Sequence, residues 1–483
     1  MSAKDEIGDL NPFTLRSPMS PLRVAPSGRV FQTFDGEAFL PVGANDSIMW
    51  AGLKPLRDRL DVPSVQAYLK SFADNGANIV RLFLEYAHDD KWYFEKPVGS
   101  VQPKMAQLWD DLFDECERAG LRVLLAPWDN FWMARRWHRH PYNACNGGPA
   151  GSCSAFFEDE ATIEATMRRF EWVIERYAGR AVLAAWDLFN EIDPYWGADA
   201  RGQSAVLARL SQAIRAKELA VQGWTRPQSV SCFGPNPQGD LADLIFRHPD
   251  FDFATTHIYS PGAIDFPRDT FSPAVQMAQW TRFGRSQTPA SRPFFDTEHG
   301  PIHLFNDRKR WLEEEFDVEY ERHLMWAHLA SGGAGSGFRW PARHPHVLLD
   351  GHKTAFKGLA LFARALDWNT FEHRDATAEL EVRGGARQVV PFALRDENQG
   401  LVYFLRRPSA KHRGIMPHRA PLSSVEVRWP NWSAARVRVR YFEPIAGCWL
   451  DEETVAPRKG VLKLQLPAWD RELAVALGTW EVG

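Results

Sequence analysis

The sequence predicts an α/β fold, in which a (β/α)8 TIM barrel is followed by a C-terminal antiparallel β-sandwich domain. Eight short apolar runs spread over roughly 300 residues, with helical segments between them, have the count and spacing of such a barrel. From about residue 370 onward, apolar and polar residues alternate with a period of two, which predicts antiparallel strands and a separate β domain. A chain of 483 residues is long enough for both parts.

The eight apolar runs carry little polar alternation, as expected of parallel strands that are buried on both faces. They lie at 39–45, 78–84, 122–128, 182–189, 229–234, 253–259, 293–298 and 335–340. Apolar residues at helical spacing predict helices over 64–76, 105–120 and 160–179. An open doubly wound sheet is the alternative, but no glycine-rich phosphate loop follows any of the runs.

The expected organisation has three parts. Residues 1–28 show weak periodicity and form an irregular lead-in. Residues 29–369 form the barrel, which begins with a β-hairpin because an Asp-Gly pair separates two apolar runs. Residues 370–483 form the sandwich, where the text ARVRVRYF is typical of antiparallel strands with one solvated face.

Composition excludes several classes of protein. A formal net charge of -4 gives no electrostatic reason to expect nucleic acid or an anionic membrane as a partner. The chain lacks a run of 18 apolar residues and a basic-then-apolar leader, so we expect no membrane span and a cytoplasmic location. The five cysteines are few, although Cys145 and Cys153 share a Gly-rich segment, and a disulfide there would argue for export. Twenty tryptophans favour a surface that stacks against flat ligands.

Two glutamates follow predicted strands at the end where TIM barrels hold their active sites. Glu191 comes after the fourth apolar run, and Glu298 ends the seventh. Either residue alone is weak evidence, because a glutamate at a strand end is more often a solvated charge. As a pair they would face each other across the barrel mouth, and glycoside hydrolysis needs two such carboxyl groups.

The residues around both glutamates resemble a known family. WDLFNEID at 186–193 and FFDTEHG at 294–300 are similar to the two catalytic motifs of clan A glycoside hydrolases, particularly family 5, which contains cellulases and mannanases. The resemblance covers residues 30–345. It implies that Glu191 is the acid/base, that Glu298 is the nucleophile of a retaining reaction, and that Asn190 binds the sugar 2-hydroxyl.

Four further residues match the family by resemblance. Arg81 is similar to the strand-two arginine that supports the nucleophile, and His257 and Tyr259 are similar to a strand-six pair whose tyrosine hydrogen-bonds to it. Trp340 is similar to the strand-eight tryptophan on which the first sugar stacks. Each also has a structural alternative: a buried ion pair for the arginine, a hydrogen-bonded core position for the histidine, core packing for the tyrosine, and closure of the barrel top for the tryptophan.

The chain departs from the family after the third predicted strand, where many members carry a histidine. Here the segment holds Trp128, Asp129, Asn130 and Trp132, and we expect some of these to line the sugar cleft. His299, which follows the nucleophile motif, either contacts substrate or hydrogen-bonds to other active-site groups.

The sequence predicts neither a metal site nor a cofactor. His138 and His140, like His344 and His346, are spaced by two, but no HExxH or cysteine-pair pattern accompanies them. We therefore expect solvated loop histidines. The sequence also has no G-x-S-x-G motif, which argues against a serine hydrolase.

The function that these observations favour is a retaining glycoside hydrolase that cleaves β-linked bonds in a β-glucan, a β-mannan or a related oligosaccharide. Its partner is then an oligo- or polysaccharide. A transglycosylase using the same site is one alternative, and a non-catalytic carbohydrate-binding protein on a degenerate barrel is another. The sequence leaves open the linkage, endo or exo action, and any protein partner.

Overall fold

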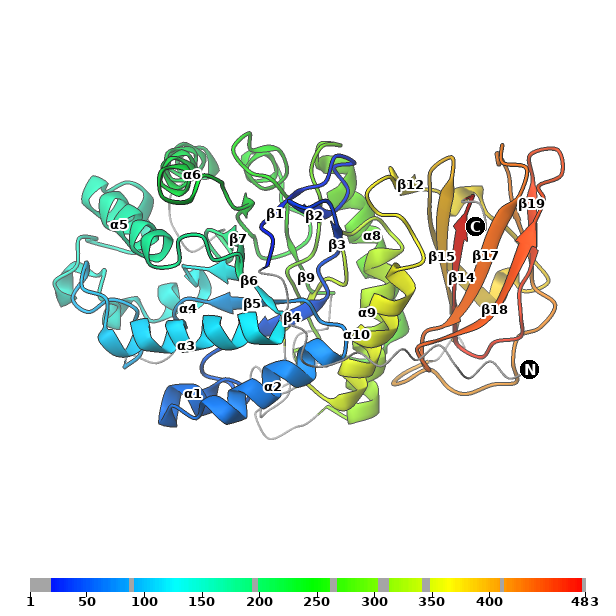
Figure 1. Cartoon of the computed structure of the whole chain (residues 1–483), viewed down its shortest axis with the longest axis horizontal. Helices are drawn as coiled ribbons and strands as arrows, with labels where there is room; N and C mark the ends of the chain where they lie inside the picture. The colour runs from blue at the N-terminus through cyan, green and yellow to red at the C-terminus, as the bar shows by residue number, and fades with distance from the viewer. Residues whose placement is uncertain are drawn as a thin grey trace.

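The structure of the chain is a computed structural model. It describes residues 19–86, 91–192, 199–260, 267–302, 312–340, 348–408 and 412–479. Figure 1 shows two parts side by side, a larger one in which helices surround parallel strands and a smaller one made of antiparallel strands. Most of the predicted lead-in, residues 1–18, lies outside the described residues.

The larger part is the predicted barrel. Its eight strands pair in parallel in the order β8-β7-β6-β5-β4-β11-β10-β9, and a bridge between Phe233 and His257 closes the ring. The strands are β4 (Gly43–Asp46), β5 (Ile79–Phe83), β6 (Arg122–Ala126), β7 (Leu183–Asp187), β8 (Gln228–Ser229), β9 (His257–Ile258), β10 (Glu298–His299) and β11 (Phe338–Arg339). All eight overlap the predicted runs, but the last four are only two residues long.

Helices cover the outside of the barrel. They are α1 (Lys54–Arg59), α2 (Val62–Asp74), α3 (Pro103–Ala119), α4 (Asn130–Arg135), α5 (Glu160–Arg176), α6 (Ala200–Gln222), α7 (Asp240–Ala242), α8 (Phe271–Gln287), α9 (Glu314–Leu329) and α10 (Asp350–Ala363). A π-helical turn, η4 (Asp243–Arg247), continues α7, and short 3-10 turns are η1 (Trp137–Arg139), η2 (Ala144–Asn146), η3 (Ser154–Phe157), η5 (Thr377–Glu379) and η6 (Ala386–Gln388). The three predicted helices are confirmed as α2, α3 and α5. Asp61 and Asp159 cap α2 and α5 by accepting a backbone hydrogen bond, which satisfies an otherwise unpaired N–H at each start.

The predicted hairpin is also present, as part of a three-stranded antiparallel sheet of β1 (Leu22–Val24), β2 (Phe31–Thr33) and β3 (Ala38–Phe39). Phe31 packs edge-on against Phe253 and Phe295, with ring centroids 5.4 and 6.3 Å apart. Phe253 and Phe295 lie before β9 and β10, so the sheet closes the amino-terminal end of the barrel. The opposite, carboxyl end is the one that carries the predicted site.

The smaller part is the predicted β-sandwich. One sheet has the order β12-β14-β15-β20-β17-β18 and the other the order β13-β16-β19, all antiparallel. Its strands are β12 (Arg374–Asp375), β13 (Glu381–Arg383), β14 (Val389–Arg395), β15 (Gln399–Arg406), β16 (Glu426–Trp429), β17 (Val437–Glu443), β18 (Cys448–Val455), β19 (Leu462–Gln465) and β20 (Glu472–Gly478). The fold class expected from the sequence is therefore confirmed for both parts.

The two parts meet along α9, which lies between the barrel strands and the sandwich in Figure 1. Trp326 of α9 packs against Phe442 of β17 at 5.8 Å between ring centroids. Beside this apolar contact, the Arg322 guanidinium donates twice to the Glu472 carboxylate, at 2.7 and 3.0 Å, and all four side chains are buried. The sandwich is thus attached to the helix that follows β10.

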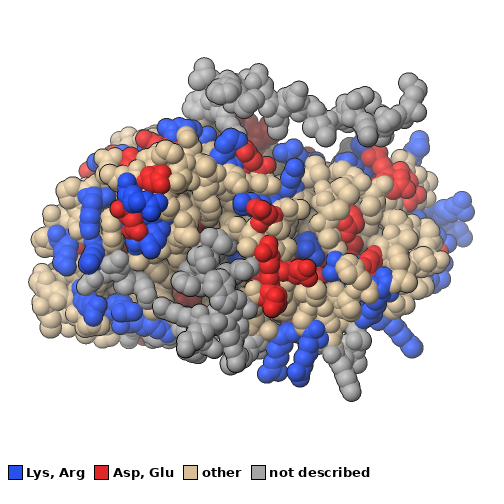
Figure 2. Space-filling view, turned by 90° about the horizontal axis from the view of Figure 1, so that it is seen from below, with Lys and Arg blue, Asp and Glu red and all other residues tan. Residues whose placement is uncertain are grey.

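On the outer surface, basic and acidic side chains lie side by side over the face shown in Figure 2, as the small net charge leads one to expect. Within the described residues, no helix is both long and apolar enough to cross a membrane.

Candidate active site

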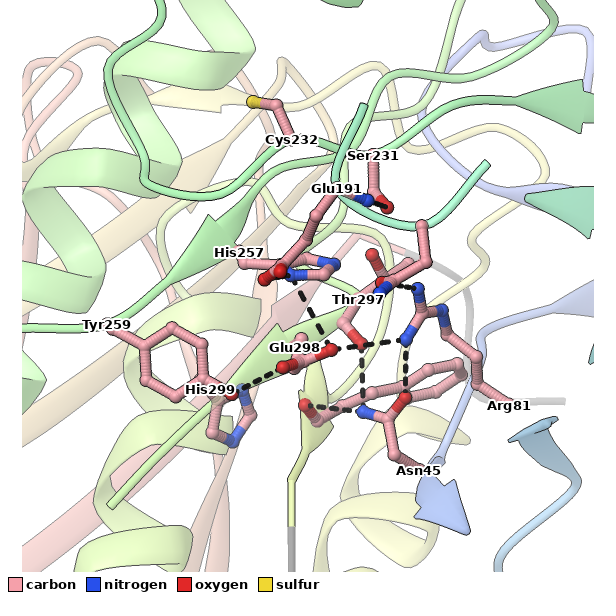
Figure 3. Close-up of polar contacts among 12 residues, drawn as sticks. Asn45, Arg81, Glu191, Ser231, Cys232, His257, Tyr259, Thr297, Glu298 and His299 are labelled. Carbon is pink, nitrogen blue, oxygen red and sulfur yellow. Dashed lines mark hydrogen bonds and ion pairs between the residues drawn. The ribbon is translucent and has the colours of Figure 1, made fainter. Parts of the chain in front are cut away.

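The two predicted glutamates lie together at the carboxyl end of the barrel. Glu298 opens β10, and Glu191 follows the end of β7 by four positions. Both are buried, with 4% of Glu191 and 6% of Glu298 exposed. One carboxylate oxygen of each and a ring nitrogen of His257 all lie within 4.8 Å of one another. Figure 3 shows the three side chains, which come from different strands, converging on one point.

Glu298 is held by two donors, Tyr259 and Arg81, and lies close to His257. Tyr259 Oη donates to Oε1 over 2.6 Å, while Arg81 Nη1 lies 3.3 Å and His257 Nδ1 lies 3.5 Å from Oε2 (Figure 3). Burial raises the pKa of the Glu298 carboxyl, and the nearby Glu191 carboxylate raises it further. The charge of Arg81 and the hydrogen bond from Tyr259 oppose that shift. Arg81 and Tyr259 therefore favour an ionised Glu298 against the effect of burial.

Glu191 is placed by its backbone as well as by its side chain. Its φ of 53° is in the left-handed region, which is unusual for a residue other than glycine and is stable only when surrounding contacts fix it. Two contacts do so: the Glu191 N–H donates to Ser231 Oγ over 3.1 Å, and Oε1 lies 2.8 Å from His257 Nδ1. Burial lowers the pKa of His257, so the ring is neutral, and its Nδ1–H tautomer donates to Glu191.

Arg81 is the centre of the network. It is completely buried and donates to Asp187 Oδ2 at 2.6 and 3.1 Å, as well as to Glu298. It also donates at 2.7 Å to the amide oxygens of Asn45 and Asn190. The sequence predicted support of the nucleophile, and the structure adds that Arg81 connects four strands, β4, β5, β7 and β10.

Three residues of this network were not predicted. Asn45 belongs to β4, Asp187 ends β7, and Ser231 follows β8. Ser231 Oγ donates to Asp187 Oδ2 over 3.0 Å, so a chain of contacts runs from Glu191 to Arg81. The available signal was the presence of polar residues inside apolar runs, where each one buries a polar group that needs a partner.

The ends of β6 and β7 bring Asp129 and Asn190 together. The two residues form a parallel bridge, and Asn190 Nδ2 donates to Asp129 Oδ1 over 3.2 Å. Since Arg81 donates to its oxygen, the Asn190 amide is fixed at both ends. Burial raises the pKa of Asp129 to about 8, so its carboxyl is largely neutral at pH 7. Asn130 is fully buried next to it.

The two tryptophans of this segment differ. Trp128 has no exposed surface, and Arg169 lies 3.9 Å from its ring centroid, so it forms part of the packing behind the site. Trp132 is partly exposed, and its Nε1 donates to Tyr86 Oη over 2.7 Å. Of the two, only Trp132 offers surface to a ligand in this structure.

An aromatic cluster lines one half of the barrel mouth. Trp340 is partly exposed after β11, and its ring lies 4.7 Å from Trp50, 5.7 Å from Phe83 and 6.3 Å from Tyr86. Tyr86 lies 6.2 Å from Trp132. We call these five residues, Trp50, Phe83, Tyr86, Trp132 and Trp340, the aromatic cluster. It adjoins Glu298 through Arg81, which lies 4.9 Å from the Phe83 ring centroid.

His299 lies behind the site, with both ring nitrogens paired. Nδ1 lies 2.5 Å from Asp296 Oδ2, and Nε2 lies 3.1 Å from Glu321 Oε2 of α9. Burial alone would lower its pKa, but the two carboxylates raise it to about 9. His299 is therefore a buried imidazolium, and the second of the two expected roles, hydrogen bonding to protein groups, fits this arrangement.

The prediction of solvated loop histidines is wrong for His140. This residue is 1% exposed, and its Nε2 lies 3.1 Å from Glu85 Oε1. The buried Glu85 carboxylate needs polar partners, and His140 supplies one in addition to Arg169. His138 is exposed as expected. His344 and His346 lie outside the described residues.

Two other open questions concern thiols and metals. Cys145 and Cys153 are not joined by a disulfide in this structure. Across the part of the chain that the structure describes, the one group of side chains close enough to hold a metal ion is Glu191, His257 and Glu298 itself. Arg81 and Tyr259 already contact Glu298, which leaves fewer of its lone pairs for an ion.

Comparison with known proteins places the fold. No family model and no curated protein matches the chain in sequence. A solved structure described as a glycoside hydrolase has a TM-score of 0.63 at 13% identity, covering 95% of this chain and 97% of the other. A family 5 glycoside hydrolase from Bacteroides vulgatus has a TM-score of 0.62 at 12% identity, covering 96% and 95%. The chain therefore has, over almost its whole length, the fold of solved glycoside hydrolases that include a member of family 5, as its two glutamate motifs led us to expect.

Proposed function

We propose that this protein is a retaining glycoside hydrolase acting on β-linked glucan, mannan or related oligosaccharides. The observation that carries the proposal is the convergence of Glu191 and Glu298, with one carboxylate oxygen of each within 4.8 Å of the other at the carboxyl end of a barrel. Retaining enzymes hold their carboxyl groups about 5–5.5 Å apart, and inverting enzymes about 6.5–9.5 Å apart to admit a water molecule. The observed spacing supports the first class.

In the proposed reaction, an Oε atom of ionised Glu298 attacks the anomeric carbon. The bond from that carbon to the leaving oxygen breaks, and the proton of Glu191 moves to this oxygen. Water then gives a proton to Glu191 and attacks the same carbon, which releases Glu298 and the sugar. One water is consumed, and two inversions give net retention.

The differences between the two glutamates support these roles. Glu298 contacts Arg81 and the Tyr259 hydroxyl, both of which favour an ionised carboxylate. Glu191 Oε1 lies 2.8 Å from Nδ1 of the neutral His257 ring, which suits a carboxyl group that exchanges a proton. Asn190 directly precedes Glu191, and its amide, fixed by Arg81 and Asp129, is suited to contact a sugar hydroxyl.

The test is the anomer released first. A panel of aryl β-glycosides, including gluco and manno configurations, is hydrolysed in an NMR tube, and the anomeric proton of the new sugar is followed before mutarotation. We expect the β anomer to appear first. Initial release of the α anomer would replace the mechanism with an inverting one, and turnover of no glycoside in the panel would favour the carbohydrate-binding alternative. Products formed at high acceptor concentration separate hydrolysis from transglycosylation.

A further inference from the structure

The barrel mouth has two unlike halves. The aromatic cluster follows or belongs to β4, β5, β6 and β11, which are neighbours in the sheet. The strands on the other side, β7, β8 and β9, lead to Glu191, Phe233 and Tyr259. A glycosidic bond that is cleaved between Glu191 and Glu298 has one sugar on each side. Each half of the mouth therefore meets a different sugar.

Among the residues of the second half that the structure describes, Phe233 is an aromatic residue open to solvent. Phe233 is 43% exposed, and it is one of the few large apolar residues in the described part of the chain that are exposed. Its ring stacks on the ring of Tyr259 with 6.0 Å between centroids and 27° between planes. The hydroxyl of that same Tyr259 donates to Glu298. An accessible aromatic ring thus lies one ring away from the proposed nucleophile.

Phe233 also flanks the proposed acid. Ser231, two residues before it, accepts the backbone hydrogen bond from Glu191. His257, which forms a parallel bridge with Phe233, contacts the Glu191 carboxylate. Because the acid must reach the leaving oxygen, the leaving group lies on the side of the site where Glu191 and its neighbours are.

We propose that Phe233, backed by Tyr259, is the stacking platform of the leaving-group subsite, which binds the departing sugar and, in the reverse sense, an incoming sugar acceptor. This rests on the proposed function. The ligand is a pyranose with an apolar face or an aryl ring, since such a face stacks on an aromatic ring while the hydroxyl groups stay hydrated. The opposite sugar then packs on the aromatic cluster.

The experiment compares two substrates that share a glycone. A β-glycosyl fluoride has no ring in its leaving group, whereas the β-linked disaccharide of the same glycone has one. For Phe233→Ala we expect kcat/KM on the disaccharide to fall about tenfold, with kcat/KM on the fluoride unchanged. Phe233→Trp is expected to retain activity on both substrates, because it keeps the platform.

Phe34 provides a matched control. It is 42% exposed and lies edge-on to Trp224, which precedes β8, so it sits at the other end of that strand from Phe233. Phe34→Ala should change neither rate. Equal losses on fluoride and disaccharide in Phe233→Ala, or no loss on either, would overturn the platform while leaving the hydrolase intact. If the unaltered protein turned over neither substrate, the proposed function would fail and the platform with it.

Discussion

Tyr259 and Glu298 are joined by a hydrogen bond of 2.6 Å in which the phenol donates to the carboxylate. Burial, and then the charge of Glu298, raise the pKa of Tyr259 well above its ordinary value, so the phenol remains a donor at any pH of an assay. The bond in turn lowers the pKa of Glu298, against the effect of burial. The hydrogen bond from Tyr259 therefore helps to keep the proposed nucleophile ionised at lower pH.

Removing this hydrogen bond should shift the pH profile. In Tyr259→Phe the pKa of Glu298 rises, so the acidic limb of kcat/KM moves to higher pH and the plateau falls about 10- to 100-fold, the effect of losing a hydrogen bond to a charged group. Tyr441→Phe is a matched control, because Tyr441 makes the same 2.6 Å bond to Glu453 in the sandwich. An unmoved acidic limb in Tyr259→Phe would show that the phenol does not tune Glu298.

Ser231 should act through the position of Glu191. Without its Oγ, the strained backbone at Glu191 loses the hydrogen bond that fixes it, and the acid is less well aligned. We expect Ser231→Ala to lower kcat/KM at least tenfold more for alkyl glycosides, which need proton donation, than for dinitrophenyl glycosides, which do not. Ser229→Ala, a buried serine in β8, is the control. Equal losses on both leaving groups would refute this role.

The buried imidazolium of His299 should make stability depend on pH. Its pKa is raised to about 9 in the folded protein, against about 6.5 unfolded. Protonated His299 therefore adds about 3 kcal/mol to the free energy of unfolding below pH 6.5, and this contribution is lost as the pH rises towards 9. Urea unfolding of the unaltered protein and of His299→Gln between pH 6 and 9.5 measures the difference in slope. Parallel curves for the two proteins would mean that His299 is not charged in the folded state.

Breaking the contact between barrel and sandwich should lower the free energy of unfolding substantially. Glu472 accepts from Arg322 and from Tyr403, and lies 3.1 Å from His323. Glu472→Gln removes the nearer of two carboxylates from the buried Arg322 charge and leaves only Glu319 at 3.8 Å, which costs about 3 kcal/mol of unfolding free energy. Glu426→Gln, at a partly exposed pair with Arg428, should move the thermal midpoint much less, because water screens this pair. Similar midpoints for both variants in thermal unfolding would contradict a tight interface.

Much of the fold could be predicted because its signals are local. Apolar runs without alternation mark buried parallel strands, and alternation in ARVRVRYF marks the sandwich strand β17. Strand length was less predictable: β8 to β11 are two residues long, because irregular backbone continues each apolar run. Burial of a run does not reveal where its ladder of hydrogen bonds ends.

The site was predictable where a strand end fixes a side chain, as for Glu298 and Tyr259. It was not predictable where function depends on partners distant in the sequence. Ser231 contacts Glu191 because β8 packs beside β7. His140 is buried against Glu85, a residue 55 positions away in the sequence. The separation of two residues along the sequence does not reveal that they form such a pair.

The central claim, that Glu298 is the nucleophile and Glu191 its acid/base partner, is tested most directly by trapping the covalent intermediate. The protein is incubated with a dinitrophenyl 2-deoxy-2-fluoro-β-glycoside of its preferred glycone, digested, and mapped by tandem mass spectrometry. We predict one fluorosugar per chain, attached to Glu298 through an ester bond. A label on Glu191 or on any other residue, or steady turnover of this substrate with no covalent adduct, would contradict the account.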